Sequence, residues 1–171
     1  IVLIGFLCSG KSTTGKVLSQ KLSLTFFDLD HFLEQKLGPI PAFIEQFGVA
    51  AFREREYRLL IDTMPAEGAI ISTGAGTIMP MRSRKLLAAF LPQVYFLDAP
   101  FQVLYDRMAA LPPHLCRRPD FLVAPKESSR LVMLDEYRRR RPLYQRFGIT
   151  IDATRSSLDV AENIANIVCE H

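Results

Sequence analysis

The sequence predicts a three-layer α/β/α protein in which helices cover both faces of a five-stranded parallel sheet. Five short apolar runs alternate along the chain with helical patterns, and this alternation is typical of a parallel sheet that is buried on both faces. A glycine-rich loop stands directly between the first apolar run and the first helical pattern. The 171 residues, 49% hydrophobic and 23% charged, have the size and composition of a single globular domain over 1–171.

The first half of the chain contains three of the predicted strands. The sequences IVLIG, LTFFD and GAIIST form the apolar runs at 1–5, 24–28 and 68–73. The helical patterns that follow them cover Lys11–Leu22, Asp30–Leu37, Ala50–Thr63 and about Met81–Phe90.

The second half contains the other two strands, QVYFLD at 93–98 and GITID at 148–152. Its helical patterns cover Phe101–Met108, about Ser128–Phe147 and about Leu158–Val168. Four prolines between 111 and 125 exclude regular structure there, so we expect a loop.

The composition, net charge and cysteines of the chain exclude some classes of protein. No apolar stretch approaches the roughly 20 residues that span a bilayer, and the apolar start lacks the charged lead-in of a signal peptide. The net charge of +3 suits an anionic ligand as well as nucleic acid. Cys8, Cys116 and Cys169 form no CxxC pair, which favours reduced thiols in a cytoplasmic protein. We expect a monomer that binds neither membranes nor nucleic acid.

The loop GFLCSGKST at 5–13 has the spacing G-x-x-x-x-G-K-[ST] of a phosphate-binding loop. In that motif backbone N–H groups surround the phosphates, the lysine reaches the terminal phosphate and the hydroxyl coordinates Mg²⁺. The predicted nucleotide contacts are Cys8, Ser9, Gly10, Lys11, Ser12 and Thr13, with Ser12 on the metal. A glycine turn that matches by chance is the alternative. We interpret Cys8 as a small buried hydrophobic residue rather than a redox-sensitive thiol.

Four distant stretches meet at one edge of the predicted sheet. The carboxyl ends of parallel strands lie together, and ligands bind there. That edge collects Gly5–Ser12, Asp28–Asp30, Ser72–Gly76 and Asp98.

An ordered series of motifs resembles shikimate kinase over nearly the whole chain. The motifs are the phosphate loop, D-x-D in FFDLDHFLEQKLG, F-R-x-x-E in FGVAAFRERE, G-x-G in ISTGAG, R-P in RRPDF and R-x-P-L-Y in RRPLY. The resemblance implies a P-loop kinase fold with strand order 2-3-1-4-5, substrate-binding helices at about 30–63 and a lid at about 110–126. It also implies transfer of the ATP γ-phosphate to the 3-hydroxyl of shikimate, with Mg²⁺, in aromatic amino-acid biosynthesis.

The acceptor has a carboxylate at one end, which Arg53 and Arg140 suit because a guanidinium grips a carboxylate with two parallel hydrogen bonds. The resemblance assigns this end to Arg53, Arg140 and the segment Gly74, Ala75 and Gly76. Glu56 lies three residues after Arg53, on the same helix face, and is suited to hold its guanidinium. The alternative for Arg53 is a solvated helix charge.

Three aspartates are candidates for contacting the substrate hydroxyl or the metal ion at the phosphates. We expect Asp30 to accept a substrate hydroxyl and take its proton, and Asp28 to hold Mg²⁺ through water together with Ser12. The alternative for Asp30 is a helix cap. The pattern VYFLD alone favours Asp98 for the metal, but the resembling family does not use that strand end, so we rank Asp98 below Asp28.

Further arginines complete the predicted site. Arg118 matches the family's lid arginine, which neutralises charge on the transferring phosphoryl group; a solvated basic loop is the alternative. By analogy Arg107 and Arg155 flank the adenine. The run Arg138–Arg141 does not form one basic stripe, because successive helical residues point about 100° apart. We therefore expect Arg140 to face the site, with Glu136 four residues before it.

Ala75 departs from the family pattern, which has glycine there. If this residue needs a positive φ, alanine costs about 1 kcal/mol. The departure leaves open a paralogue for another hydroxy acid, such as a gluconate-kinase-like enzyme, or a metabolite sensor without turnover. Lys11, Ser12, Asp28 and Asp30 favour a kinase, since a sensor has no need of them.

Overall fold

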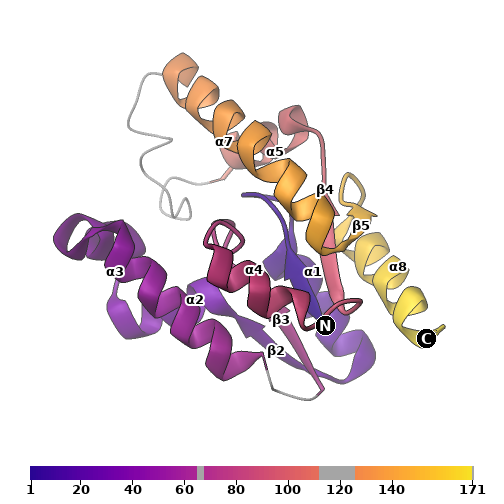
Figure 1. Cartoon of the computed structure of the whole chain (residues 1–171). Coiled ribbons are helices and arrows are strands. Elements are labelled where there is room, and N and C mark those ends of the chain that lie inside the picture. The colour runs from indigo at the N-terminus through magenta and orange to yellow at the C-terminus, as the bar shows by residue number, and fades with distance from the viewer. Residues whose placement is uncertain (65–67, 112–125, 171) are drawn as a thin grey trace.

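The computed structural model describes residues 1–64, 68–111 and 126–170. Its centre is a five-stranded sheet (Figure 1) with the order β2-β3-β1-β4-β5. Every pair of neighbouring strands is parallel. The strands are β1 (Val2–Ile4), β2 (Thr25–Asp28), β3 (Ala69–Ser72), β4 (Val94–Asp98) and β5 (Ile149–Asp152). Fold class and strand order are therefore confirmed.

Helices cover both faces of this sheet (Figure 1). They are α1 (Lys11–Leu22), α2 (Leu29–Leu37), α3 (Ile40–Thr63), α4 (Met81–Ala88), α5 (Phe101–Ala109), α7 (Lys126–Phe147) and α8 (Ser157–Cys169). On one face α1 packs against α8, while on the other α7 contacts α4, α5 and β4. None of the described helices is both long and apolar enough to cross a membrane.

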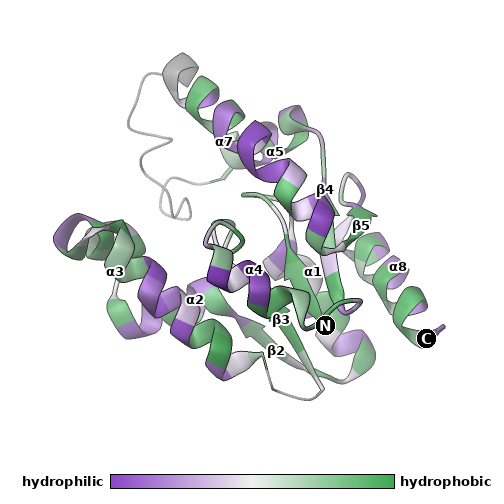
Figure 2. Ribbon diagram, in the orientation of Figure 1, coloured by the Kyte–Doolittle hydropathy of each residue, from purple (hydrophilic) through white to green (hydrophobic). Residues whose placement is uncertain are grey.

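The core lies along the central strands, which are the apolar elements at the middle of Figure 2. Leu3, Ile70 and Val94 on β1, β3 and β4 are completely buried. Burying one such side chain stabilises the fold by about 1.5–3 kcal/mol. The polar segments of α3 and α7 face outward in the same view, so the apolar sheet fixes the positions of the strand ends that form the site.

Helix α3 consists of two helical segments that meet at a kink at Gly48; the predicted helix Ala50–Thr63 lies in the second segment, and the first segment, which begins at Ile40, was not predicted. The sequence around Pro41 and Gly48 resembles a loop, but proline is tolerated in the first turn of a helix. Gly48, with φ 80° and ψ 161°, is not helical and separates the two segments of α3 at the kink. The added turns bring Ile40 against Phe52 in a small second core cluster, which forms part of the cavity described below.

Candidate active site

The predicted phosphate loop connects β1 to α1, as the motif requires. Gly10 is the N-cap of α1 and has a φ of 91°, in the left-handed region that glycine adopts without cost. Cys8 also has a positive φ, 57°, and it is half-buried rather than buried as expected. The Lys11 ammonium donates hydrogen bonds to the carbonyls of Gly5 (2.9 Å) and Phe6 (2.8 Å). The loop thus holds its own lysine inward.

A cavity of about 330 Å³ lies beside this loop, at the carboxyl edge of the sheet. Its volume is at the lower end of the range of small-molecule sites. The predicted site residues among its lining are Cys8, Gly10, Lys11, Ser12, Thr13, Asp30 and Ala75. The structure therefore brings together the phosphate loop, the end of β2 and the turn after β3, as predicted from the strand ends.

The two aspartates after β2 have different positions. Asp28 is the N-cap of α2, and its Oδ1 accepts a hydrogen bond from the His31 N–H at 3.2 Å. The alternative interpretation of Asp30 as the helix cap is therefore wrong. Asp30 lies in the first turn of α2 and faces the turn after β3: a Cβ added to Gly74 would lie 2.6 Å from Asp30 Oδ1. Gly74 is thus required for the close approach of this carboxylate.

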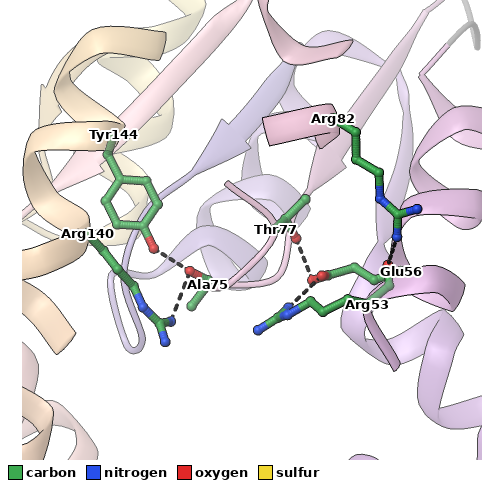
Figure 3. A network of polar contacts seen from close by, with 7 residues as sticks. All are labelled: Arg53, Glu56, Ala75, Thr77, Arg82, Arg140 and Tyr144. Atoms are coloured by element: carbon green, nitrogen blue, oxygen red, sulfur yellow. Dashed lines mark hydrogen bonds and ion pairs between the residues drawn. The ribbon is translucent and has the colours of Figure 1, made fainter. Parts of the chain in front are cut away.

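Glu56 connects Arg53 to the same turn (Figure 3). Arg53 Nη1 lies 2.5 Å from Glu56 Oε2, and the Thr77 hydroxyl donates to Glu56 Oε1 at 2.7 Å. The Glu56 side chain is 3% exposed and that of Arg53 18%, so Arg53 is not a solvated helix charge. A Cβ on Gly76 would lie only 2.0 Å from Arg53 Nη2. The guanidinium therefore rests directly on the backbone of Gly76.

Arg140 and Tyr144 of α7 contact the turn from its other side (Figure 3). Arg140 Nη1 donates to the Ala75 carbonyl at 3.3 Å, and the Tyr144 hydroxyl donates to the same oxygen. Arg140 also pairs with Glu136, as expected from their spacing. Burial raises the pKa of Glu136, but hydrogen bonds and charge from its two arginine partners outweigh burial and hold that pKa below its usual value.

Arg140 has one further polar atom directed into the protein. Its Nε is buried and has no hydrogen-bond partner among the described residues. Buried donors are normally paired, and this N–H is an exception. The Arg140 side chain is 8% exposed, whereas those of Arg139 and Arg141 are 60% and 41% exposed; that Arg140 faces the site stays a prediction.

The turn at Gly74, Ala75 and Gly76 presents its backbone to the site. None of the three has a positive φ, so alanine at 75 carries no conformational cost. Their N–H groups are buried and donate no hydrogen bond within the described part of the chain. Buried backbone donors without partners are rare in proteins. Together with the two flanking guanidiniums, they form a site that suits a carboxylate.

A second cavity lies on the other side of the phosphate loop. Arg107 and Arg155 both line it, together with Cys8 and Thr13. Arg107 Nη2 donates to the Ala153 carbonyl at 2.8 Å, which holds its side chain beside the loop. This arrangement suits the predicted adenine contacts.

Asp98 is engaged away from the phosphate loop. Arg141 forms a two-pronged contact with it, Nε to Oδ1 at 3.0 Å and Nη2 to Oδ2 at 2.6 Å. These hydrogen bonds raise the pKa of Arg141. Neither Asp98 nor Asp28 lines the cavity beside Lys11, so the ranking of Asp28 above Asp98 stays a prediction. Arg118 and most of the predicted lid at 110–126 lie outside the described residues.

Sequence reasoning missed two residues of this site. Thr77 follows the G-x-G segment directly, and its hydroxyl donates a hydrogen bond to Glu56. Tyr144 lies within the R-x-P-L-Y motif, but only its position beneath the turn reveals its contact with Ala75. The motif was a signal for Tyr144; no signal in the sequence indicated Thr77.

Comparison with known proteins gives a consistent result. Residues 7–169 match the shikimate kinase family. The chain is 37% identical to shikimate kinase from Enterococcus faecalis over 159 residues, which cover 92% of this chain and 90% of the relative. It is 32% identical to the Aquifex aeolicus shikimate kinase over 170 residues, covering 96% and 92%.

Solved structures of other proteins are similar to this chain in fold. Shikimate kinase from Acinetobacter baumannii in complex with shikimate superposes with a TM-score of 0.87 and 28% identity, covering 99% of this chain and 92% of that one. A gluconokinase from Sinorhizobium meliloti reaches a TM-score of 0.63 at 15% identity, with 99% and 90% coverage. At that identity the second likeness concerns the fold alone.

Proposed function

The chain belongs to the shikimate kinase family, an ATP-dependent family of kinases, and we propose that it transfers the γ-phosphate of ATP to the 3-hydroxyl of shikimate. The products are shikimate 3-phosphate and ADP. One observation carries the proposal: Lys11 and Asp30 line the same cavity as Ala75, whose turn is flanked by Arg53 and Arg140. The phosphate loop and the turn that suits a carboxylate therefore border the same cavity.

The chemistry follows from this arrangement. The loop N–H groups and Lys11 hold the phosphates of ATP. The turn at 74–76, with Arg53 and Arg140, holds the carboxylate of shikimate. Asp30 accepts a hydrogen bond from the 3-hydroxyl and takes its proton as the new O–P bond forms and the bond to the β-phosphate oxygen breaks.

Magnesium fits the oxygen donors at the start of α1 and the end of β2. The described residues contain no group of three or more His, Cys, Asp or Glu side chains that could hold a metal. Mg²⁺ needs no such group, because it keeps several waters and binds through one or two protein oxygens and substrate phosphates. We propose that Ser12 and, through water, Asp28 supply those oxygens. When bound, Mg²⁺ neutralises phosphate charge.

A pair of variants tests the metal assignment. Asp28→Asn keeps a side-chain cap on α2, since asparagine caps as well as aspartate, but removes the charge that orients metal-bound water. We expect the Mg²⁺ concentration for half-maximal activity to rise roughly tenfold. Asp98→Asn is the control, because Asp98 pairs with Arg141. An unchanged Mg²⁺ dependence in Asp28→Asn, or an equal rise in Asp98→Asn, contradicts the assignment.

The function itself is tested by ADP release with a panel of acceptors: shikimate, quinate, gluconate and nucleoside monophosphates. We expect turnover with shikimate to exceed that with each of the others. Faster turnover of gluconate would support the gluconate-kinase-like alternative, which no contact among the described residues favours. No ADP release with any acceptor would instead support a non-catalytic sensor.

Three further expectations belong to this proposal. Arg118 and the lid at 110–126 complete the site over the transferring phosphoryl group, and Arg107 and Arg155 flank the adenine. The enzyme is a single domain over 1–171 that acts as a cytoplasmic monomer on small molecules, without nucleic acid or membrane partners. Light scattering on the purified chain tests the monomer.

A further inference from the structure

The hydroxyl of Tyr144 is a buried polar group that the proposed chemistry does not use. Tyr144 is 1% exposed, and its ring stacks on Phe96 of β4 with centroids 5.2 Å apart and planes inclined by 20°. This packing fixes the position of the hydroxyl, which donates to the carbonyl of Ala75, 69 residues away in the sequence. The contact joins α7 to the turn after β3.

Holding this carbonyl also orients the next N–H group. The peptide bond between Ala75 and Gly76 is trans. In a trans peptide the C=O and the following N–H lie in one plane and point in opposite directions. Because the Ala75 carbonyl is directed to α7, the Gly76 N–H is directed away from α7, toward the side of the turn on which Arg53 rests (Figure 3).

The second donor to the Ala75 carbonyl is Arg140, which in the proposed function also binds the carboxylate of shikimate. A guanidinium that binds the substrate carboxylate has fewer N–H groups left for Ala75. The proposed function assigns the Tyr144 hydroxyl no contact with shikimate. Tyr144 is therefore suited to keep the peptide in place when Arg140 engages a ligand.

From these contacts we infer that Tyr144 is a positioning residue for the acceptor. It holds the 75–76 peptide so that the Gly76 N–H donates to the shikimate carboxylate beside Arg53. The inference rests on the proposed function and adds to it a residue that does not touch the substrate.

Tyr144→Phe tests this role, because it keeps the ring on Phe96 and removes only the hydroxyl. We expect the KM for shikimate to rise roughly five- to tenfold, the loss of one neutral hydrogen bond. The KM for ATP and kcat should stay within twofold of wild type, since the phosphate loop and Asp30 are unaffected. A purely structural role would change both KM values or neither.

Tyr137→Phe is the matched control. Tyr137 lies on the same helix, and its hydroxyl also donates to an alanine carbonyl, that of Ala99 at 3.2 Å. Ala99 is outside the site, so both KM values should remain those of wild type. Equal shikimate KM values in wild type and Tyr144→Phe, or the same rise in Tyr137→Phe, would overturn the inference.

A measurement on the unmodified chain covers the case in which Tyr144→Phe does not fold. Adding shikimate to ¹⁵N-labelled protein should move the Gly76 amide proton downfield, as a new hydrogen bond does. A Gly76 resonance that stays in place, in protein that turns over shikimate, overturns the inference alone. If the wild-type protein releases no ADP with shikimate and does not bind it, the proposed function fails instead.

Discussion

Asp30→Asn abolishes most of the turnover and leaves nucleotide binding intact; this is the largest effect we expect. Asparagine has the shape of aspartate and still accepts a hydrogen bond, but it does not take the proton of the attacking hydroxyl. Loss of a positioned acid–base group lowers kcat by about 10²–10⁴-fold. The fold should not suffer, because Asp28, not Asp30, caps α2.

The measurement combines steady-state ADP release with titration of ATP by calorimetry. Asp62→Asn serves as control: Asp62 lies exposed on α3, and the variant removes one negative charge outside the site. It should retain wild-type rates. Wild-type ADP release in Asp30→Asn would remove Asp30 from its role, as would an equal loss of ATP affinity and kcat.

The second large effect concerns Gly76→Ala, which adds one methyl group. Its Cβ would lie 2.0 Å from Arg53 Nη2, so the guanidinium must leave its position between Glu56 and the turn. Hydrogen bonds to charged groups contribute about 1.5–3 kcal/mol. We therefore expect the KM for shikimate to rise on the order of 10- to 100-fold, with an unchanged KM for ATP. Overpacking should cost about 1–3 kcal/mol of stability.

A double-mutant cycle with Arg53→Ala shows whether the effect passes through Arg53. In the Arg53→Ala background the displaced guanidinium is absent, so adding Gly76→Ala should raise the KM for shikimate little further. Additive effects of the two substitutions would contradict the mechanism. Thermal unfolding of all four proteins separates loss of binding from loss of fold.

Much of the architecture could be predicted because it depends on patterns that are local in sequence. Apolar runs and helical periodicity predicted the strands, and the rule that ligands bind at the carboxyl ends of parallel strands placed Lys11, Asp30 and Ala75 at one edge. The exception is the segment of α3 before Gly48, which was missed because Pro41 and Gly48 usually interrupt helices. Pro41 lies in a first turn, whereas Gly48 does interrupt the helix, at the kink.

Details of the site depended on distant contacts that no local pattern contains. The glycine pattern around Ala75 suggested a need for positive φ, whereas the structure shows that Gly74 and Gly76 make room for side chains of α2 and α3. That Asp28 rather than Asp30 caps α2 depends on where α2 begins, and sequence patterns define helix ends least well. The contact of Tyr144 with Ala75 joins residues 69 positions apart.

The interlocking of Arg53, Glu56, Gly76 and Thr77 has a consequence for how this chain can evolve. Each of these residues either leaves room for the side chain of another or pairs with its charge. Removing one partner of a buried ion pair costs several kcal/mol. Descendants that abandon carboxylate recognition should therefore lose these positions together rather than one at a time. A side chain larger than hydrogen at 76 that appears beside a retained arginine at 53 would mark a lineage in transition.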